Sequence, residues 1–336
     1  MEERLSAAQG ELLAHVRAGV ATVTLNRPKA LNALSFAMLR GLSEWLEAWR
    51  ADERVRSIVF RGAGTRAFCA GGDVREIHAS YTAGEAIHDE FFAFEYDLDY
   101  RIHRYPKPIV AVLDGIVMGG GMGISQGARL RIVGDRTRMA MPETAIGLFP
   151  DVGGSYFLSR TPGRLGVYLG LTGVTIGAAD AIYCGLADTY IGAHEAPPPG
   201  ELERLRPAID RHFAAGSVEG IVASLAAERS PEHESWARET VSKLRQRSPT
   251  MLKVTLEQLT SAAQLSLAEC FRMELGLIHG CFEQGDFAEG IRAVLVDKDQ
   301  KPRWNPPAIA QVDAGNVRAF FRARWDAAAH PLAHLQ

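Results

Sequence analysis

Two patterns of apolar residues divide this chain. Over roughly the first 190 residues, short apolar runs of strand length recur, separated by turns and helices. Leu12–Arg17 and Val20–Leu25 are two such runs joined by Ala18-Gly19, which predicts a β-hairpin. Further short strands are expected at Ser57–Arg61, Ile109–Leu113, Arg131–Val133, Met139–Met141 and Asp188–Ile191.

Helical periodicity separates these strands. Ser35 is placed to cap a helix that reaches about Arg50, with apolar residues recurring on one face. A long helix is expected over Glu85–Arg104, ending before Pro106-Lys107-Pro108. Shorter helices are predicted at Gly120–Gly127, Arg164–Leu171 and Gly177–Cys184.

After Ala196-Pro-Pro-Pro-Gly200 the pattern is helical almost throughout. Helices are expected at Glu201–Ala214, Val218–Glu228, Glu232–Arg245, Thr250–Ala262, Ser266–His279 and Asp286–Val296, whereas residues 302–336 show no strong pattern. The alternation of strands and helices predicts a layered α/β core at residues 1–195, followed by a helical region at residues 196–336.

Composition narrows the class of protein. The chain has 336 residues and a formal net charge of −3, so it has no overall positive field that would attract nucleic acid or a membrane surface. The four cysteines lack the paired spacing of a zinc site or disulfide framework. No signal peptide or membrane-spanning run is visible, so we expect a cytoplasmic protein. The cysteine spacing predicts no bound metal, and we expect no separate cofactor.

The strongest chemical pattern is a pair of acids in an apolar segment. Glu143 and Asp151 lie within Met141–Gly154, and no basic residue occurs between Met139 and Ser159. An acid that loses hydration resists ionisation, which suits proton transfer. The alternative is structural: Glu143 would cap a turn, and Asp151 would cap a helix beginning at Val152.

Two glycine loops could bind a developing oxyanion. Backbone amides are unobstructed in Ala70-Gly71-Gly72-Asp73 and in Gly119-Gly120-Gly121, and one amide from each could bind a carbonyl oxygen. By itself, the first loop is more typical of a simple tight turn without a function. Glu95, within a phenylalanine-rich helix, is by itself more typical of a solvated residue.

Taken together, these stretches resemble the crotonase (enoyl-CoA hydratase/isomerase) superfamily. The resemblance rests on Phe68–Arg75, Pro106–Pro108, Met118–Gly123 and Met141–Gly154; it covers roughly Leu12–Ile191 and reappears at Asp286–Trp304. It implies an α/β spiral of ββα units with a helical C-terminal region. It also implies an acyl-CoA substrate, with valine catabolism as the expected pathway.

The resemblance assigns roles by motif position. Gly120 and the Ala70–Gly72 loop match the amides that hold the thioester oxygen, with Ala70 and Gly72 as candidate donors. Glu143 matches the family's catalytic glutamate, and Asp151 and Glu95 match acids of its hydrolase branch. Arg27, Ala30 and Leu31 fall where relatives contact the CoA nucleotide.

One departure from the hydratases favours hydrolysis. Hydratases carry a second catalytic glutamate where this chain has Gly123. We therefore expect hydrolysis of a short, branched β-hydroxyacyl-CoA of the 3-hydroxyisobutyryl type. An enoyl-CoA isomerase or hydratase and a non-catalytic acyl-CoA-binding protein are the alternatives. The chain could form a homo-oligomer, as many relatives do, or its helical tail could cover the same surface.

Overall fold

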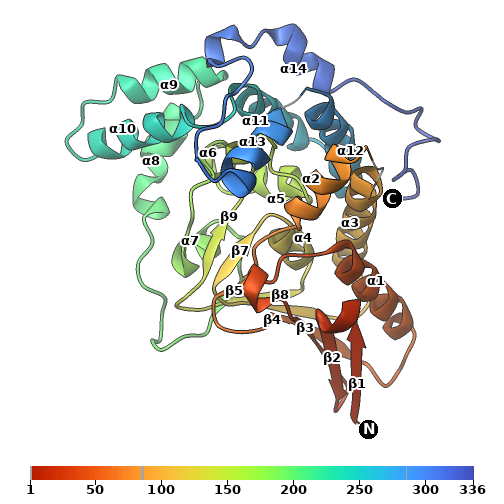
Figure 1. Ribbon diagram of the computed structural model, residues 1–336. Helices are drawn as coiled ribbons and strands as arrows, with labels where there is room; N and C mark the ends of the chain where they lie inside the picture. Colours follow the sequence, from red (N-terminus) through yellow and green to blue (C-terminus); the bar gives the residue numbers. More distant parts are fainter. Residues whose placement is uncertain (1, 85–86, 285) are drawn as a thin grey trace. The chain divides into compact units, whose positions relative to one another are not determined.

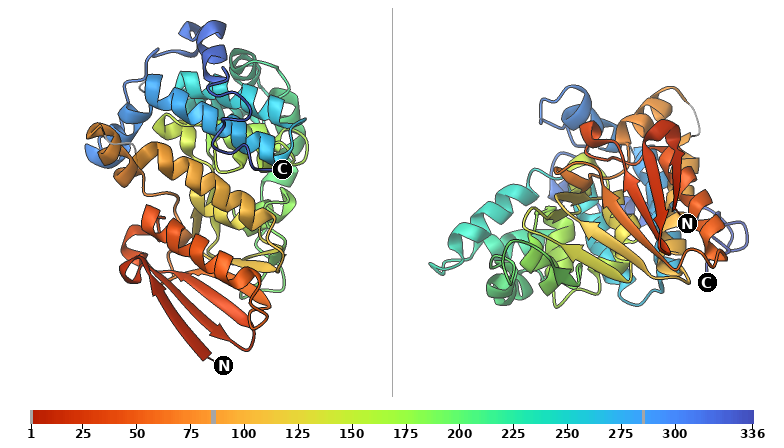
Figure 2. Two further views of the ribbon diagram at one scale, coloured as in Figure 1. Left: turned by 90° about the vertical axis from the view of Figure 1, so that its right-hand side faces the viewer. Right: turned by 90° about the horizontal axis from the view of Figure 1, so that it is seen from below.

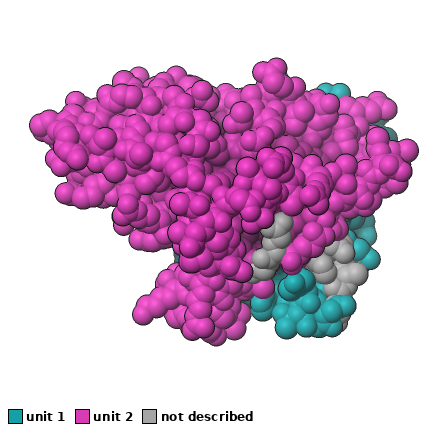
Figure 3. Space-filling view, turned by 90° about the horizontal axis from the view of Figure 1, so that it is seen from above, with its two compact units in different colours: residues 1–140, 175–200 teal, residues 141–174, 201–336 magenta. Residues whose placement is uncertain are grey.

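The computed structural model describes residues 2–84, 87–284 and 286–336, which form two compact units. Unit 1 comprises Met1–Ala140 and Thr175–Gly200, and unit 2 comprises Met141–Val174 and Glu201–Gln336 (Figure 3). This division differs from the boundary expected at residue 196. The segment Met141–Val174 groups with the helical region because its short helices pack against helices from that region.

Unit 1 is built on a seven-stranded sheet, shown in Figure 1. The hairpin predicted from the sequence is present as β2 (Leu12–Arg17) and β3 (Val20–Leu25), and β1 (Glu2–Ala7) adds an antiparallel edge. From β3 onward the pairing is parallel, through β4 (Ser57–Gly62), β6 (Ile109–Leu113), β8 (Leu130–Val133) and β10 (Thr189–Tyr190).

Unit 1 also contains a second sheet, which has three parallel strands. Its strands are β5 (Ala67–Cys69), β7 (Ile116–Met118) and β9 (Arg138–Ala140), in that order. The chain therefore passes from the first sheet to the second three times, from β4 to β5, from β6 to β7 and from β8 to β9. Helices follow the first two of these strand pairs. This is the predicted spiral of ββα units.

The helices of unit 1 pack against its strands and against one another. Helix α1 (Phe36–Arg50) contacts β1 and β2, and Figure 2 shows it lying along these strands. Ser35 caps it, as predicted, by accepting a hydrogen bond from Met38 N at 3.3 Å. The remaining helices are α2 (Val74–Thr82), α3 (Ile87–His103), α4 (Gly120–Gln126) and α7 (Ala178–Tyr183).

The described residues of unit 2 form helices joined by turns and loops, with no β-strand among them. Helices α5 (Gly154–Leu158) and α6 (Leu165–Thr172) pack against α11 (Pro249–Ala262), and α5 also contacts α12 (Leu267–Gln284). The other helices are α8 (Leu202–His212), α9 (Val218–Ala226), α10 (Glu234–Leu244), α13 (Asp286–Ile291) and α14 (Ala314–Phe320). Among the described helices, none is long and apolar enough to cross a membrane.

The differences from the predicted elements lie in short or polar segments. Strands β5 and β7 have three residues each, which is too few to show a period of two. Helix α2 lies in a polar segment and starts at an Asp73 cap, and α14 lies in the tail that showed no strong pattern. Glu85 and Ala86, at the start of the long helix expected before Arg104, lie outside the described residues.

Asn32 fixes the loop between β3 and α1. Its side chain is fully buried, and Nδ2 donates to Ala63 O at 3.0 Å and to Ala67 O at 2.8 Å. Oδ1 accepts from Arg27 N at 3.0 Å. One side chain therefore ties this loop to the segment that enters β5.

Replacing Asn32 with Ala should destabilise the protein by about 2–4 kcal/mol, because buried backbone groups lose their partners. Asn26→Ala is the matched control, since Asn26 Nδ2 makes one hydrogen bond, to Gly10 O, in a half-buried position. That variant should lose about 1 kcal/mol. Urea unfolding followed by circular dichroism measures both, and equal losses would show that Asn32 does not fix the loop.

Candidate active site

Three of the predicted residues meet in unit 1, at the start of α4. A Cβ added to Gly120 would lie 2.6 Å from Glu95 Oε1 and 3.2 Å from Gly72 N. The first distance is shorter than real Cβ contacts and the second is tight, so a side chain at residue 120 would displace the Glu95 carboxyl group and press on the Gly72 amide. As the first residue of α4, Gly120 has an N–H with no acceptor inside the helix. This amide is therefore available to a ligand beside Gly72 and Glu95.

The backbone amides of the Ala70–Asp73 loop differ in whether they already donate a hydrogen bond within the protein. Ala70 N donates to Leu31 O at 3.1 Å, and Asp73 N donates to Leu34 O at 2.8 Å. Both amides thus already have acceptors. Of the two donors expected in this loop, Gly72 is the one whose amide lies next to Gly120, and Ala70 instead anchors the loop to Leu31.

Glu95 is buried on α3, contrary to the solvated position typical of a lone helical glutamate. Only 2% of its surface is exposed, and the neighbouring Phe91 ring would contact a Cβ added to Gly72. Burial, with the nearby charges of Glu95 and Asp99, raises the pKa of the Cys69 thiol to about 12. Cys69 is therefore an inert thiol rather than a nucleophile.

The residues expected to contact CoA form an ordered turn after β3. The Arg27 guanidinium lies 2.9 Å from Glu11 Oε1 and 2.9 Å from Asp73 Oδ2, and it also donates to Ala33 O. Ala30 is exposed, and Leu31 lies next to Ala70 through the hydrogen bond above. Arg27 thus joins this turn to the start of α2, whereas its contact with a nucleotide stays a prediction.

Glu143 begins a short 3-10 turn, Glu143–Ile146, in unit 2 and is only 6% exposed. Burial raises the pKa of its carboxyl well above the usual 4.5, and the nearby charge of Asp151 raises it further. Within the described residues, Glu143 Oε2 has no hydrogen-bond partner. The dry acid inferred from the sequence is present, with one oxygen available to a substrate.

Asp151 is 5% exposed and lies in a sharply bent segment. Val152 has φ +52° and Gly153 has φ +83°, so a β-branched residue occupies the left-handed region. Such strain is found where a side chain is held for function. Helix α5 begins at Gly154 rather than at Val152, with Gly153 at its N-cap and no side-chain cap hydrogen bond. The capping role considered for Asp151 is therefore not the one observed.

Two buried polar residues that sequence analysis missed hold this segment. Glu274 on α12 accepts from Gly153 N at 2.7 Å and from Ser155 N at 2.9 Å. Gln258 Nε2 on α11 donates to Pro150 O at 2.7 Å. Both residues lie on apolar faces of the predicted helices, and a polar residue on an apolar face was the signal that could have identified them.

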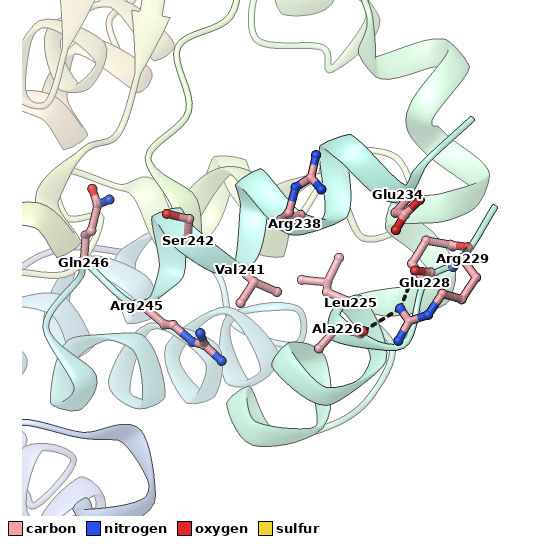
Figure 4. A pocket seen from close by; sticks show the side chains of 10 residues that line it. All are labelled: Leu225, Ala226, Glu228, Arg229, Glu234, Arg238, Val241, Ser242, Arg245 and Gln246. Carbon is pink, nitrogen blue, oxygen red and sulfur yellow. Dashed lines mark hydrogen bonds between the residues drawn. The ribbon is translucent and has the colours of Figure 1, made fainter. Parts of the chain in front are cut away.

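A cavity of about 530 Å³ lies elsewhere in unit 2, between α9 and α10 (Figure 4). Its lining includes Leu225 and Val241 together with Arg238 and Arg245. Arg229 at its edge donates to Ala226 O, as the dashed line shows. No residue singled out from the sequence lines this cavity, so it is separate from the candidate site.

An α/β spiral of ββα units whose glycine loops present backbone amides defines the crotonase fold. The sequence profile described as enoyl-CoA hydratase/isomerase matches residues 20–198 and 192–321. The chain belongs to the enoyl-CoA hydratase/isomerase family.

Relatives of this chain carry hydrolase names. A protein from Danio rerio named 3-hydroxyisobutyryl-CoA hydrolase, mitochondrial, is 40% identical over 338 residues, which cover 91% of this chain and 87% of that protein. A protein from Arabidopsis thaliana named 3-hydroxyisobutyryl-CoA hydrolase 1 is 37% identical over 350 residues, covering 94% and 92% of the two chains.

Similar solved structures carry other names. An enoyl-CoA hydratase from Rhodobacter sphaeroides superposes with a TM-score of 0.88 at 39% identity, covering 94% of this chain and 98% of that one. A carnitinyl-CoA dehydratase from Mycobacterium thermoresistibile superposes with a TM-score of 0.88 at 41% identity, covering 93% and 96%. The names thus agree on CoA esters and differ in the reaction.

Replacing Glu143 with Gln should stabilise the protein, and more at pH 8 than at pH 5. The folded pKa of Glu143 is raised, so its contribution to stability is present below the ordinary 4.5 and lost as pH rises through the folded value. Each pKa unit corresponds to about 1.4 kcal/mol, or roughly 2–4 °C in melting temperature.

Thermal melting at the two pH values measures this effect. Glu257→Gln, on the exposed side of α11, is the control and should change neither melting temperature. A Glu143→Gln variant that melts at or below the wild-type temperature at pH 8 would show that Glu143 is not held in a destabilising environment.

Proposed function

We propose that this protein hydrolyses a short, branched β-hydroxyacyl-CoA thioester of the 3-hydroxyisobutyryl-CoA type to the free acid and CoA. The observation that carries the proposal is the buried pair Glu143 and Asp151, in a chain that has Gly123 where a hydratase needs its second acid. The names of the relatives from Danio rerio and Arabidopsis thaliana agree with it.

In this mechanism the thioester carbonyl oxygen accepts hydrogen bonds from the amides of Gly72 and Gly120. These amides stabilise the negative charge that develops on the oxygen, and one such donor typically contributes a factor of about 10²–10³ in rate. The carboxylate of Glu143 either attacks the carbonyl carbon or removes a proton from an attacking water. In both routes the carbon–sulfur bond breaks and CoA leaves as the thiolate.

The two routes differ in one intermediate. Attack by Glu143 forms an acyl anhydride, and water then cleaves it to give the acid and regenerate the carboxylate. Attack by water gives the acid directly. Both routes need Glu143 ionised, and its raised pKa brings the carboxyl closer to the working pH, where a general base is most effective.

In this proposal, Asp151 and Glu95 select the substrate by binding its β-hydroxyl group. Both are buried, so an analogue without the hydroxyl would leave a polar group without its ligand partner. Arg27, Ala30 and Leu31 would contact the CoA nucleotide. The reaction needs water and no separate cofactor.

An enoyl-CoA isomerase or hydratase is the second candidate, because two similar solved structures are named as a hydratase and a dehydratase. These reactions leave the thioester intact, so release of free thiol separates them from hydrolysis.

The location and the oligomeric state of this chain stay predictions. We expect a cytoplasmic protein that could form a homo-oligomer, whereas the relative from Danio rerio is named mitochondrial.

Wild-type protein should release free thiol from 3-hydroxyisobutyryl-CoA, and Glu143→Ala should lower kcat/KM about a thousandfold, since it removes the base or nucleophile. A thiol-reactive chromophore follows the reaction. Glu257→Ala, a matched loss of an exposed glutamate, should retain wild-type activity. Near wild-type thiol release by Glu143→Ala would rule out the proposed role.

Asp151→Asn should lower kcat/KM for 3-hydroxyisobutyryl-CoA about a hundredfold, with much less effect on isobutyryl-CoA, because only the first substrate has the β-hydroxyl. The melting temperature should change little. Asp326→Asn, an exposed substitution of the same kind, is the control. Equal losses on both substrates together with a large melting shift would assign Asp151 a structural role.

A further inference from the structure

The segment that carries Asp151 is held from two neighbouring helices of unit 2. Its own conformation is strained, because Val152 adopts a left-handed φ of +52°. A strained turn persists only where surrounding groups determine it. Among the described residues, Gln258 of α11 and Glu274 of α12 form hydrogen bonds with its backbone.

Of these two residues, Glu274 is the one whose burial costs more free energy, because its side chain is an acid. It is fully buried on the apolar face of α12, next to Phe271, whose ring would contact a Cβ added to Gly153. Burial raises the pKa of its carboxyl to about 8, and the nearby charge of Asp151 raises it as well. A leucine at this position would avoid that cost, so packing alone does not account for an acid.

Its hydrogen bonds show what the acid does. Oε2 accepts from Gly153 N at 2.7 Å, and Oε1 accepts from Ser155 N at 2.9 Å and from the Ser155 hydroxyl. The bonded amides lie two and four residues after Asp151. One of them belongs to Gly153, which has a left-handed φ, so the Glu274 carboxyl group fixes the bend of the backbone just after Asp151.

Gln258 holds the other side of Asp151. Its Nε2 donates to Pro150 O at 2.7 Å, and its side chain is fully buried. Backbone groups on both sides of Asp151 are therefore fixed by buried side chains. Asp151 lies between these two fixed points of the backbone.

We propose that Glu274 is a positioning residue, which fixes the Pro150–Ser155 turn so that Asp151 can recognise the β-hydroxyl of the substrate; the inference rests on the proposed function. Glu274 does not contact substrate. It acts through Asp151, so its effect should be specific to substrates that carry the hydroxyl. A residue needed only for folding would affect all acyl-CoA substrates equally.

The test is Glu274→Gln, which replaces one of the two acceptor oxygens with a donor. We expect kcat/KM for 3-hydroxyisobutyryl-CoA to fall about tenfold to a hundredfold, as displacement of a binding group typically produces. The loss on isobutyryl-CoA should be at most about twofold. In the Asp151→Asn background, Glu274→Gln should cause no further change in the ratio of the two kcat/KM values, because the interaction it supports is already lost.

Glu283→Gln is the matched control, an exposed glutamate on the same helix, and it should keep the wild-type ratio. Should Glu274→Gln fail to fold, Gln258→Met tests the other side of the turn and should lower the same ratio. An unchanged ratio in the folded variant, or an equal loss on both substrates, would overturn the positioning role. Absence of thiol release by wild-type protein would instead overturn the proposed function.

Discussion

Two acids, buried close together in one turn, repel each other and lose their hydration. This unfavourable arrangement is the constraint on which the rest of the structure depends. Glu143 and Asp151 are eight residues apart, and each is almost fully buried. Burial and the like charge of Asp151 both raise the pKa of Glu143, so folding alone disfavours the pair. Its presence is explained by proton-transfer chemistry, and unit 2 provides buried hydrogen-bond partners that hold the turn in spite of that cost.

Unit 1 meets a different physical requirement, which is the presentation of bare backbone amides. The parallel strands of the spiral end in loops where Gly72 and Gly120 approach each other, and a side chain at residue 120 would have to displace the Glu95 carboxyl group. Arg27 and Asn32 hold the adjoining turn with ion pairs and hydrogen bonds. The reaction as proposed needs these amides to stabilise charge and the acids of unit 2 to direct attack.

The sequence was most informative where periodicity or motif length was sufficient. The hairpin, helix α1 and strand β6 follow from apolar spacing, and the spiral and family followed from the glycine loops and the Met141–Gly154 motif. Three-residue strands such as β5 carry no measurable period. Glu274 and Gln258 act on a segment more than 100 residues away, so their role depended on tertiary contacts that no local pattern records.

The most direct measurement is the titration of the Glu143 carboxyl itself. Carbon-13 NMR of glutamate-labelled protein, with the resonance assigned by its loss in Glu143→Gln, reports this pKa in the absence of substrate. The account predicts a value above the usual 4.5 that falls in Asp151→Asn, since one like charge is removed. A value at or below 4.5 that does not change in Asp151→Asn would contradict it.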